Sequence, residues 1–202
     1  MTPPGTFERV YAAIRQRLGN GLYRPGERLE PALLSDELNA SVTPVRDALH
    51  RLTGERLVDA PRHEGFRNPM LTETMLRHLY AWHLDLLLLA VMRRGPSAAD
   101  PGQSTADDTD APAYRRQAAL FLALARGTGN PEHAIAVEGV SARLQPVQKF
   151  EDRFLDETET ETADILRSLQ AQDRKALRSS LLRYHRRRQR IVPQLLGALL
   201  ER

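Results

Sequence analysis

The residues best suited to bind another molecule lie on one short predicted helix that follows Val42. The inward stripe of this helix is apolar and recurs at helical spacing: Val45, Ala48, Leu49 and Leu52. Its outward positions are polar or charged: Thr43, Arg46, Asp47, His50 and Arg51. Hydroxyl and guanidinium groups at the N-terminal end of a helix can contact phosphates and base edges, so the pattern favours a helix that reads DNA. A small helical core with ordinary solvated arginines is the alternative interpretation.

Two earlier helices are expected to support this one. The first begins with Thr6 as its N-cap and stops at Asn20 and Gly21. Its apolar face repeats every four residues, at Val10, Ile14 and Leu18. The second begins at Pro31 and ends at Asn39, which can adopt the left-handed conformation. The apolar residues of the second helix are Leu33, Leu34 and Leu38.

The third helix is expected to have Thr43 as its N-cap, Pro44 at its first position and Gly54 at its end. After it, Leu57-Val58, a turn at residues 61–65 and Phe66 predict a small β-hairpin. The connection between the second and third helices, residues 38–43, is too short for an ordinary antiparallel pair and favours a helix-turn-helix crossing. Residues 1–70 therefore predict a winged helix-turn-helix DNA-binding domain.

These motifs together resemble the GntR family of bacterial transcription regulators. The resemblance covers residues 7–68 and rests on four segments: Tyr23–Leu29, Leu34–Leu38, Ser41–Leu49 and Gly54–Val58. It implies a DNA interface made by the recognition helix and the tip of the wing: Ser41, Thr43, Arg46, His50, Arg51, Arg62, His63 and Gly65. Val42 stands where the family usually has an arginine that contacts the operator. The usual docking mode is therefore expected, but not the usual operator sequence.

Residues 71–202 predict long helices and resemble the FCD domain of FadR-like members, an all-helical domain that binds effectors and dimerises. The matching segments are Ala125–Pro131 and Ile165–Leu169, with Asp173 after them. The expected fold class is mostly α, with an antiparallel all-helical bundle after the winged domain. A flexible loop is expected at residues 95–112, which hold several Pro, Gly and Asp residues.

Many FCD domains hold a divalent metal, and the resemblance places its ligand positions at Ala118, Leu122, Thr162 and Tyr184. None of these is a good metal ligand, so neither a metal nor another cofactor is expected. A small organic-acid-like effector would then be held by arginine or other polar groups. The candidates for this role are Tyr80, His83, Tyr184 and His185. For Tyr80 and His83, core or dimer packing is the favoured interpretation and a ligand cavity is the alternative.

Two stretches of the second half bear on assembly and charge. Leu84–Met92 is apolar nearly all round, which suits the centre of a bundle or a subunit interface and motivates a homodimer. Tyr184–Arg190 is polybasic, and the favoured interpretation is a solvated face opposite Leu177, Leu181 and Leu182. Phosphate contact by this run is the secondary interpretation.

Composition narrows the remaining function classes. The 202 residues include 27 Arg and 2 Lys, yet the net charge is only +3 and is not segregated, so DNA contact depends on where a few arginines are placed. The chain has no Cys, which excludes disulfide scaffolds and Cys-ligated metals and, with no signal peptide, fits the cytoplasm. The longest apolar run, Leu86–Met92, is shorter than the ~20 residues of a membrane span. No catalytic motif stands out, so an enzyme is not expected.

The expected function is that of a bacterial transcription regulator, with repression as the favoured mode. It would bind a near-palindromic, double-stranded operator as a homodimer, and a small effector could shift the spacing of its two DNA-binding heads. The alternative is a helical ligand-binding or scaffold protein that retains a degraded, non-DNA-binding head. Salt-dependent binding to arbitrary duplex DNA separates the two.

Overall fold

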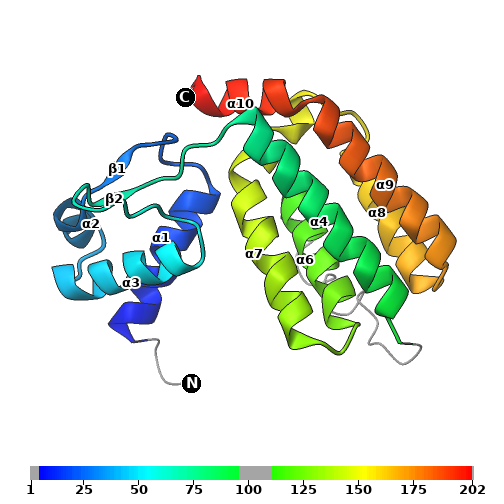
Figure 1. Ribbon diagram of the computed structural model, residues 1–202, viewed down its shortest axis with the longest axis horizontal. Coiled ribbons are helices and arrows are strands. Elements are labelled where there is room, and N and C mark those ends of the chain that lie inside the picture. Colours follow the sequence, from blue (N-terminus) through cyan, green and yellow to red (C-terminus); the bar gives the residue numbers. More distant parts are fainter. Residues whose placement is uncertain (1–4, 96–110, 202) are drawn as a thin grey trace. The chain divides into compact units, whose positions relative to one another are not determined.

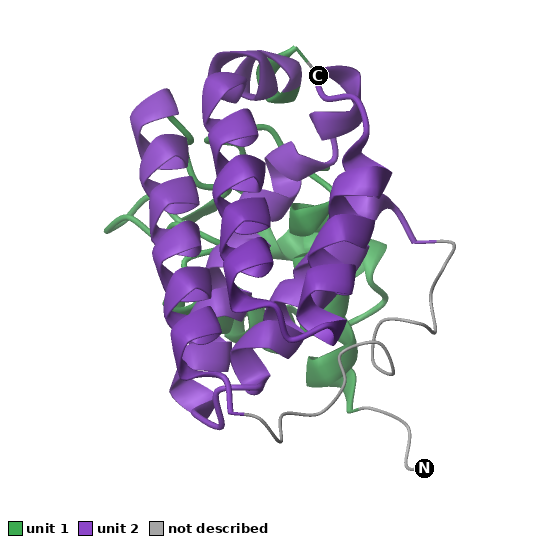
Figure 2. Cartoon of the chain, turned by 90° about the vertical axis from the view of Figure 1, so that its right-hand side faces the viewer, with its two compact units in different colours: residues 1–72, 199–202 green, residues 73–198 purple. Residues whose placement is uncertain are grey.

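The computed structural model describes residues 5–95 and 111–201. The chain divides into two compact units, which Figure 2 colours separately: unit 1 is residues 1–72 with 199–202, and unit 2 is residues 73–198. The loop expected at residues 95–112 falls almost wholly on residues 96–110, which lie outside the described part of the chain.

Unit 1 is a winged helix-turn-helix fold, as predicted. Its elements in chain order are α1 (Thr6–Gly19), β1 (Arg28–Leu29), α2 (Pro31–Glu37), α3 (Val42–Gly54) and β2 (Phe66–Arg67) (Figure 1). Only residues 38–41 separate α2 from α3, and Asn39 takes the predicted left-handed conformation there with a φ of 46°. This tight turn sets the crossing of the two helices.

One apolar core holds the helices of unit 1 together. α3 contributes the whole predicted stripe, fully buried: Val45, Ala48, Leu49 and Leu52. α1 contributes Val10 and Ile14, which are also fully buried. Of the three apolar residues named for the second helix, Leu34 and Leu38 are buried, whereas Leu33 is 63% exposed. Leu34 and Leu38 are four positions apart and share one helix face, and Leu33 falls on another.

The helix starts differ from the predicted ones. Gly5, not Thr6, is the N-cap of α1, and Ser41, not Thr43, is the N-cap of α3. Pro44 is consequently the third residue of α3, where it still fits because the first N–H groups of a helix lack intrahelical partners. α3 ends at Gly54 as predicted, but Arg56 supplies the left-handed conformation, with a φ of 60°.

The wing is built from three short extended segments rather than the predicted hairpin alone. β1 pairs antiparallel with β2, with Arg28 opposite Arg67 and Leu29 opposite Phe66. Asp59 exchanges two backbone hydrogen bonds with Arg67 of β2, of 2.9 and 2.8 Å. The segment that follows α3 therefore pairs with β2 through one residue only. The segment before α2 therefore completes the sheet, an addition that local spacing did not show.

Unit 2 is a helical bundle. Its elements are α4 (Glu73–Arg93), α6 (Ala113–Arg126), α7 (Pro131–Gln148), the 3₁₀ turn η1 (Glu151–Arg153), α8 (Thr158–Gln170), α9 (Arg174–Arg190) and most of α10 (Val192–Leu200) (Figure 1). α4 packs against α6, α7 and α9, while α8 packs against α6 and α9. Asn130 caps α7 and Asp173 caps α9, each accepting a hydrogen bond from a first-turn backbone N–H.

α4 differs in character from the other helices. Within the described residues it is the one helix long and apolar enough to cross a membrane, although core helices pass the same test. Its buried side includes Leu76, Tyr80, Leu87 and Ala90, none of which is exposed. Apolar residues also occur outside this buried side, in agreement with the prediction that Leu84–Met92 is apolar nearly all round the helix.

Candidate nucleic-acid interface

The outer face of α3 carries the predicted recognition residues. Ser41 precedes the helix, and Thr43, Arg46 and His50 occupy exposed positions along it. Arg46 lies one turn from the N-terminal end, which has the positive end of the helix dipole. A guanidinium and unpaired backbone N–H groups at one end of a helix suit contact with phosphate and base edges.

His50 links the recognition helix to the wing. Its ring lies edge-on to that of Phe66 on β2, with centroids 4.9 Å apart and an interplanar angle of 76°. Beside this contact lies a cleft of about 490 Å³ between α3 and the wing, including β1. Arg28, Arg46 and His50 line it, and Glu30 is the one acidic side chain among its lining residues. The cleft is therefore cationic on balance.

Arg28 is an interface candidate that the sequence analysis did not identify. Its Nη2 donates a hydrogen bond to the Glu64 carbonyl oxygen at 3.3 Å, and its Nε lies 3.4 Å from the Glu30 carboxylate. These contacts hold the guanidinium beside the tip of the wing. The available signal was alternation: Leu29 is buried, so its neighbours in an extended strand must point outward.

The tip of the wing presents the predicted Arg62 and His63 as exposed side chains. The Glu64 backbone N–H donates to the Pro61 carbonyl at 3.2 Å and closes the turn. His63 and Gly65 both have positive φ, 64° and 76°, which reverses the chain direction within a few residues. The wing can therefore place a cation and an imidazole at its apex.

The structure separates Arg51 from the other candidates. Its guanidinium stacks on Tyr11 of α1 at 4.1 Å from the ring centroid. Its Nε lies 3.3 Å from the Glu55 carboxylate, and its Nη1 lies 3.6 Å from that of Glu8. Two carboxylates and an aromatic ring thus engage a charge that the sequence analysis assigned to DNA, and these contacts tie α3 to α1.

The predicted effector residues of unit 2 all lie in its interior. His83 on α4 and His185 on α9 are buried, with His83 Nδ1 and His185 Nε2 3.0 Å apart. Burial lowers the pKa of His83 well below its usual value, and lowers that of His185 to about 4. Both rings are therefore neutral at pH 7.

Neutrality fixes the direction of each hydrogen bond around the two rings. His185 Nδ1 lies 2.8 Å from the Leu181 carbonyl oxygen, so this nitrogen carries the proton and donates. His185 Nε2 must then accept, and His83 Nδ1 donates to it. His83 Nε2 is left as an acceptor for the Ser141 hydroxyl, 3.2 Å away. Three side chains thus form a one-directional chain from Ser141 to α9.

Tyr184 belongs to a second part of the same interior. Its hydroxyl donates to Gln117 Oε1 at 3.2 Å and accepts from Gln148 Nε2 at 3.3 Å. Gln117 in turn donates to Thr162 Oγ1 at 2.7 Å. Gln148 Oε1 is buried and has no hydrogen-bond partner in the described part of the chain. Polar groups from α6, α7, α8 and α9 therefore meet around one phenol.

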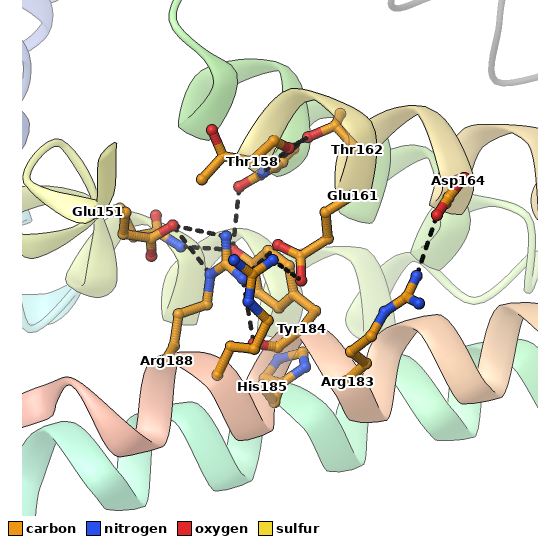
Figure 3. A network of polar contacts seen from close by, with 12 residues as sticks. Glu151, Thr158, Glu161, Thr162, Asp164, Arg183, Tyr184, His185 and Arg188 are labelled. Carbon is orange, nitrogen blue, oxygen red and sulfur yellow. Dashed lines mark hydrogen bonds and ion pairs between the residues drawn. The ribbon is translucent and has the colours of Figure 1, made fainter. Parts of the chain in front are cut away.

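A buried ion cluster completes this interior and corrects the interpretation of the polybasic run (Figure 3). Arg188 was expected on a solvated face, but it is fully buried over the Tyr184 ring, at 3.3 Å from the centroid. Its Nε donates to Glu151 at 2.9 Å, and its Nη1 donates to Glu161 at 2.5 Å. Burial lowers the pKa of Arg188, but the interactions with Tyr184, Glu151 and Glu161 outweigh it and raise the pKa above its usual value, so the guanidinium is charged.

Helical spacing held the signal for this burial. The inward residues of α9 are Leu177, Ser180, Leu181, Tyr184, His185 and Arg188. Arg188 follows Tyr184 by four positions and therefore falls on the same face. Its counter-charges come from η1 and α8, far away in the sequence, so charge alone could not identify them.

The residues at the family's metal positions do not fit a metal ion. Ala118 and Leu122 offer no donor atom, and Thr162 Oγ1 donates to the Thr158 carbonyl at 2.8 Å. Burial raises the pKa of Tyr184 above its usual value, so its oxygen keeps the proton. Across residues 5–95 and 111–201, no three His, Cys, Asp or Glu side chains are grouped so that they could hold a metal.

Comparison with known proteins identifies the type of domain. Residues 6–67 match the family model described as bacterial regulatory proteins, gntR family. The HTH-type transcriptional repressor GlaR of Escherichia coli K12 is 24% identical over 140 residues, 59% of this chain and 62% of that protein. The Nta operon transcriptional regulator of Aminobacter aminovorans is 40% identical over 58 residues, 29% of this chain and 28% of that protein. The chain thus spans less than two thirds of these relatives.

Solved structures extend the likeness in fold over both units. A GntR transcriptional regulator from Rhodococcus sp. RHA1 has a TM-score of 0.75 at 23% identity, and covers 95% of this chain and 98% of that chain. E. coli McbR/YncC has a TM-score of 0.69 at 21% identity, with the same two coverages. The matched family model, the fold and the cationic face of α3 agree that residues 6–67 are a winged helix-turn-helix domain of the gntR family of bacterial regulatory proteins.

Proposed function

We propose that the protein is a bacterial transcription regulator that binds double-stranded DNA through unit 1. The observation that carries the proposal is the cationic cleft where Arg46 on α3 and Arg28 on β1 face the same space beside the wing. Two guanidinium groups on rigid elements can bind successive phosphates or a phosphate and a guanine edge. The gntR-family match of residues 6–67 supports the same function.

In the proposed complex, α3 enters the major groove with its N-terminal end first. Arg46 and Thr43 contact base edges or phosphates there, and Ser41 contacts the backbone before the helix. Val42 is half-buried beside them, so it can offer only an apolar contact, such as one with a thymine methyl group. Arg62 and His63 at the tip of the wing lie along the adjacent minor groove. Arg51 holds α1 and α3 together instead of contacting DNA.

The proposed assembly is a homodimer on a near-palindromic operator, with repression as the favoured mode. A two-fold dimer presents two recognition helices to half-sites about one helical turn, ~34–36 Å, apart. The structural likeness over unit 2 supports assignment to the FadR-like subfamily, in which the helical domain dimerises and binds effectors.

The proposed effector site is the interior around Tyr80, His83, Tyr184 and His185. The unpartnered Gln148 Oε1 supports a ligand that donates a hydrogen bond. A carboxylate would compete with Glu151 and Glu161 for Arg188, because both already bind it. A small organic acid that protects the fold against heat by several degrees would support this site, whereas acids without effect would remove it.

The test of the DNA-binding function is selection of bound fragments from the bacterial genome, followed by fluorescence anisotropy with the best duplex. The native chain should bind its selected duplex about 10³-fold more tightly than arbitrary DNA, and more weakly as salt rises. Arg46→Ala should weaken binding, and Arg186→Ala on the exposed face of α9 is the matched control. Absence of binding to any duplex at low salt would favour a helical scaffold with a degraded head.

A further inference from the structure

A small pocket lies at the end of unit 2 where α4 ends and α9 begins. Its volume is about 100 Å³, and α4, α9 and the connection from α8 to α9 each contribute to its lining. Arg174 holds the two helix ends together, because its Nη2 donates a hydrogen bond to the Arg94 carbonyl oxygen at 2.7 Å (Figure 1). We name this cavity the end pocket. None of its lining residues belongs to the interior around Tyr184, so it is a separate site.

The floor of the end pocket is apolar and fixed. It consists of Val91 from α4, Leu169 from α8 and Leu177 from α9, none of which is more than 5% exposed. α9 packs against both α4 and α8, so the three side chains belong to one packed layer. A surface made of such side chains offers water no hydrogen bond. The floor therefore suits the hydrocarbon part of a ligand.

The rim of the end pocket is cationic. Arg94 and Arg174 line it, together with the exposed amide side chain of Gln172, and none of the described lining residues is acidic. The bond to the Arg94 carbonyl uses one of the five N–H groups of Arg174 and fixes the position of its guanidinium. Over the described ranges 5–95 and 111–201, no carboxylate pairs with Arg174. This guanidinium therefore keeps donors for an anion at the mouth of the pocket.

We propose that the end pocket binds a small aliphatic monocarboxylate. Its carboxylate accepts charge-assisted hydrogen bonds from Arg174 and is attracted by the charge of Arg94. Its alkyl tail covers the floor of Val91, Leu169 and Leu177. The site goes beyond the proposed function, because it requires neither DNA nor the proposed effector site around Tyr184.

The volume of the end pocket limits the length of the tail. A water molecule takes about 30 Å³ of the liquid, so about 100 Å³ corresponds to roughly three waters. A tail of two or three carbon atoms fits this space, whereas a longer tail would have to displace buried side chains. Propionate and butyrate are therefore the expected ligands, and hexanoate is too long.

Two other classes of small molecule use only half of the site. Inorganic phosphate pairs with the guanidinium groups but brings no hydrocarbon to the apolar floor. Butyramide has the right size for the floor but lacks the charge that strengthens a hydrogen bond to arginine. A short carboxylic acid uses both halves, and this combination is what the experiment measures.

The first experiment is an NMR titration of the full chain, labelled at its leucine and valine methyl groups, with each of these compounds. Butyrate should bind with a dissociation constant of about 0.1–1 mM, a range open to a ligand of six heavy atoms. Nuclear Overhauser effects from its methyl group should reach Val91, Leu169 and Leu177. Hexanoate, butyramide and inorganic phosphate should each bind at least about tenfold more weakly.

Substitutions separate the rim from the floor. Arg174→Gln should weaken butyrate at least about tenfold, whereas Arg178→Gln, an exposed cation of α9 that does not line the pocket, is the matched control and should have no effect. Val91→Ile adds one methyl group to the floor and should shift the preference from butyrate towards propionate. A merely destabilised fold would not change the preference between two acids. Circular dichroism should show that each variant keeps its fold.

The contrary outcomes are distinct from those of the proposed function. Butyrate that binds Arg174→Gln as well as the native chain would overturn the end pocket, as would Overhauser effects to the interior around Tyr184 instead of the floor. Phosphate that binds as tightly as butyrate would show that charge alone acts here and would refute the carboxylate assignment. A chain that binds butyrate in the end pocket but no duplex DNA would overturn the proposed function and leave this inference standing.

Discussion

The His50 ring lies edge-on to the Phe66 ring at a centroid distance of 4.9 Å, and this contact joins the recognition helix to the wing. It lets the two parts of the proposed DNA interface keep a fixed geometry relative to one another. Arg46 and Arg28 on either side of the cleft then act as one preorganised pair rather than as two independent surface charges.

Arg46→Ala should weaken binding to the selected operator by about 1–3 kcal/mol, because Arg46 is exposed at the reading end of α3. Arg51→Ala is the informative comparison on the same helix. Its guanidinium contacts Tyr11, Glu55 and Glu8. The main effect of Arg51→Ala should therefore be a lower melting temperature of unit 1, with only a small loss of affinity for DNA. Anisotropy and thermal melts measure the two effects, and equal losses of affinity would contradict this division of roles.

Arg28→Ala should reduce the salt dependence of DNA binding. If Arg28 neutralises one phosphate, the slope of log K against log salt should fall by about one, and affinity should fall for all sequences alike. The measurement is anisotropy from 50 to 300 mM salt with specific and arbitrary duplexes, with Arg178→Ala on α9 as control. An unchanged slope would remove Arg28 from the interface.

Arg188→Met should destabilise unit 2 by about 3–5 kcal/mol, because it leaves the buried carboxylate of Glu151 without its counter-charge. Adding Glu151→Gln should recover part of that loss, since Arg187 still lies 3.3 Å from Glu161. Urea denaturation followed by circular dichroism gives both values. The exposed neighbour Arg186→Met is the control and should change stability by less than about 0.5 kcal/mol. A double variant less stable than Arg188→Met would refute this account.

Stability should fall on mild acidification because of the two buried histidines. Their folded pKa values lie below the usual 6.5, so the unfolded chain binds more protons than the folded one as pH drops. The stability is complete above pH 6.5 and is lost down to about pH 4 for His185, at up to about 1.4 kcal/mol per pH unit for each ring. Urea midpoints between pH 7.5 and 5.5 test this while most carboxylates stay ionised. His185→Gln should flatten the dependence, and an unchanged dependence in this variant would contradict the account.

Removal of metal should leave both folding and DNA binding unchanged. The donor atoms at the four family positions are absent, already hydrogen-bonded or protonated. Elemental analysis of protein purified without added metal should find no stoichiometric zinc, nickel or manganese. A melting temperature that drops by several degrees with chelator would show that other residues bind a metal.

Local patterns predicted unit 1 well because its determinants are local. The buried stripe of α3, the left-handed Asn39 and the first-position Pro31 each follow from neighbours within a few residues. The N-caps were misplaced because Thr6 and Thr43 suit the N-cap position as well as Gly5 and Ser41 do, and neither Gly5 nor Ser41 makes a side-chain capping bond that would distinguish it. Arg28 escaped notice because its role depends on β2, which lies nearly forty residues later.

The interior of unit 2 was harder to predict because its determinants are distant in sequence. His83 and His185 were both candidates from the sequence, but nothing in their own helices indicates that they lie 3.0 Å apart. The solvated interpretation of Tyr184–Arg190 failed at Arg188 because two carboxylates from η1 and α8 compensate its burial. A run of basic residues is normally assigned to the surface, and the run itself does not show that carboxylates from other helices will pair with one of its members.

The one-directional hydrogen-bond chain from Ser141 through His83 to His185 limits which amino-acid substitutions these positions can accept during evolution. Each member must offer an acceptor on one side and a donor on the other, because the Leu181 carbonyl at the end of the chain only accepts. A single replacement such as Ser141→Ala strands His83 Nε2 without a donor. Substitutions at these three positions that do not destabilise the fold must therefore occur together. We expect related chains to have either all three polar residues or apolar residues at all three positions.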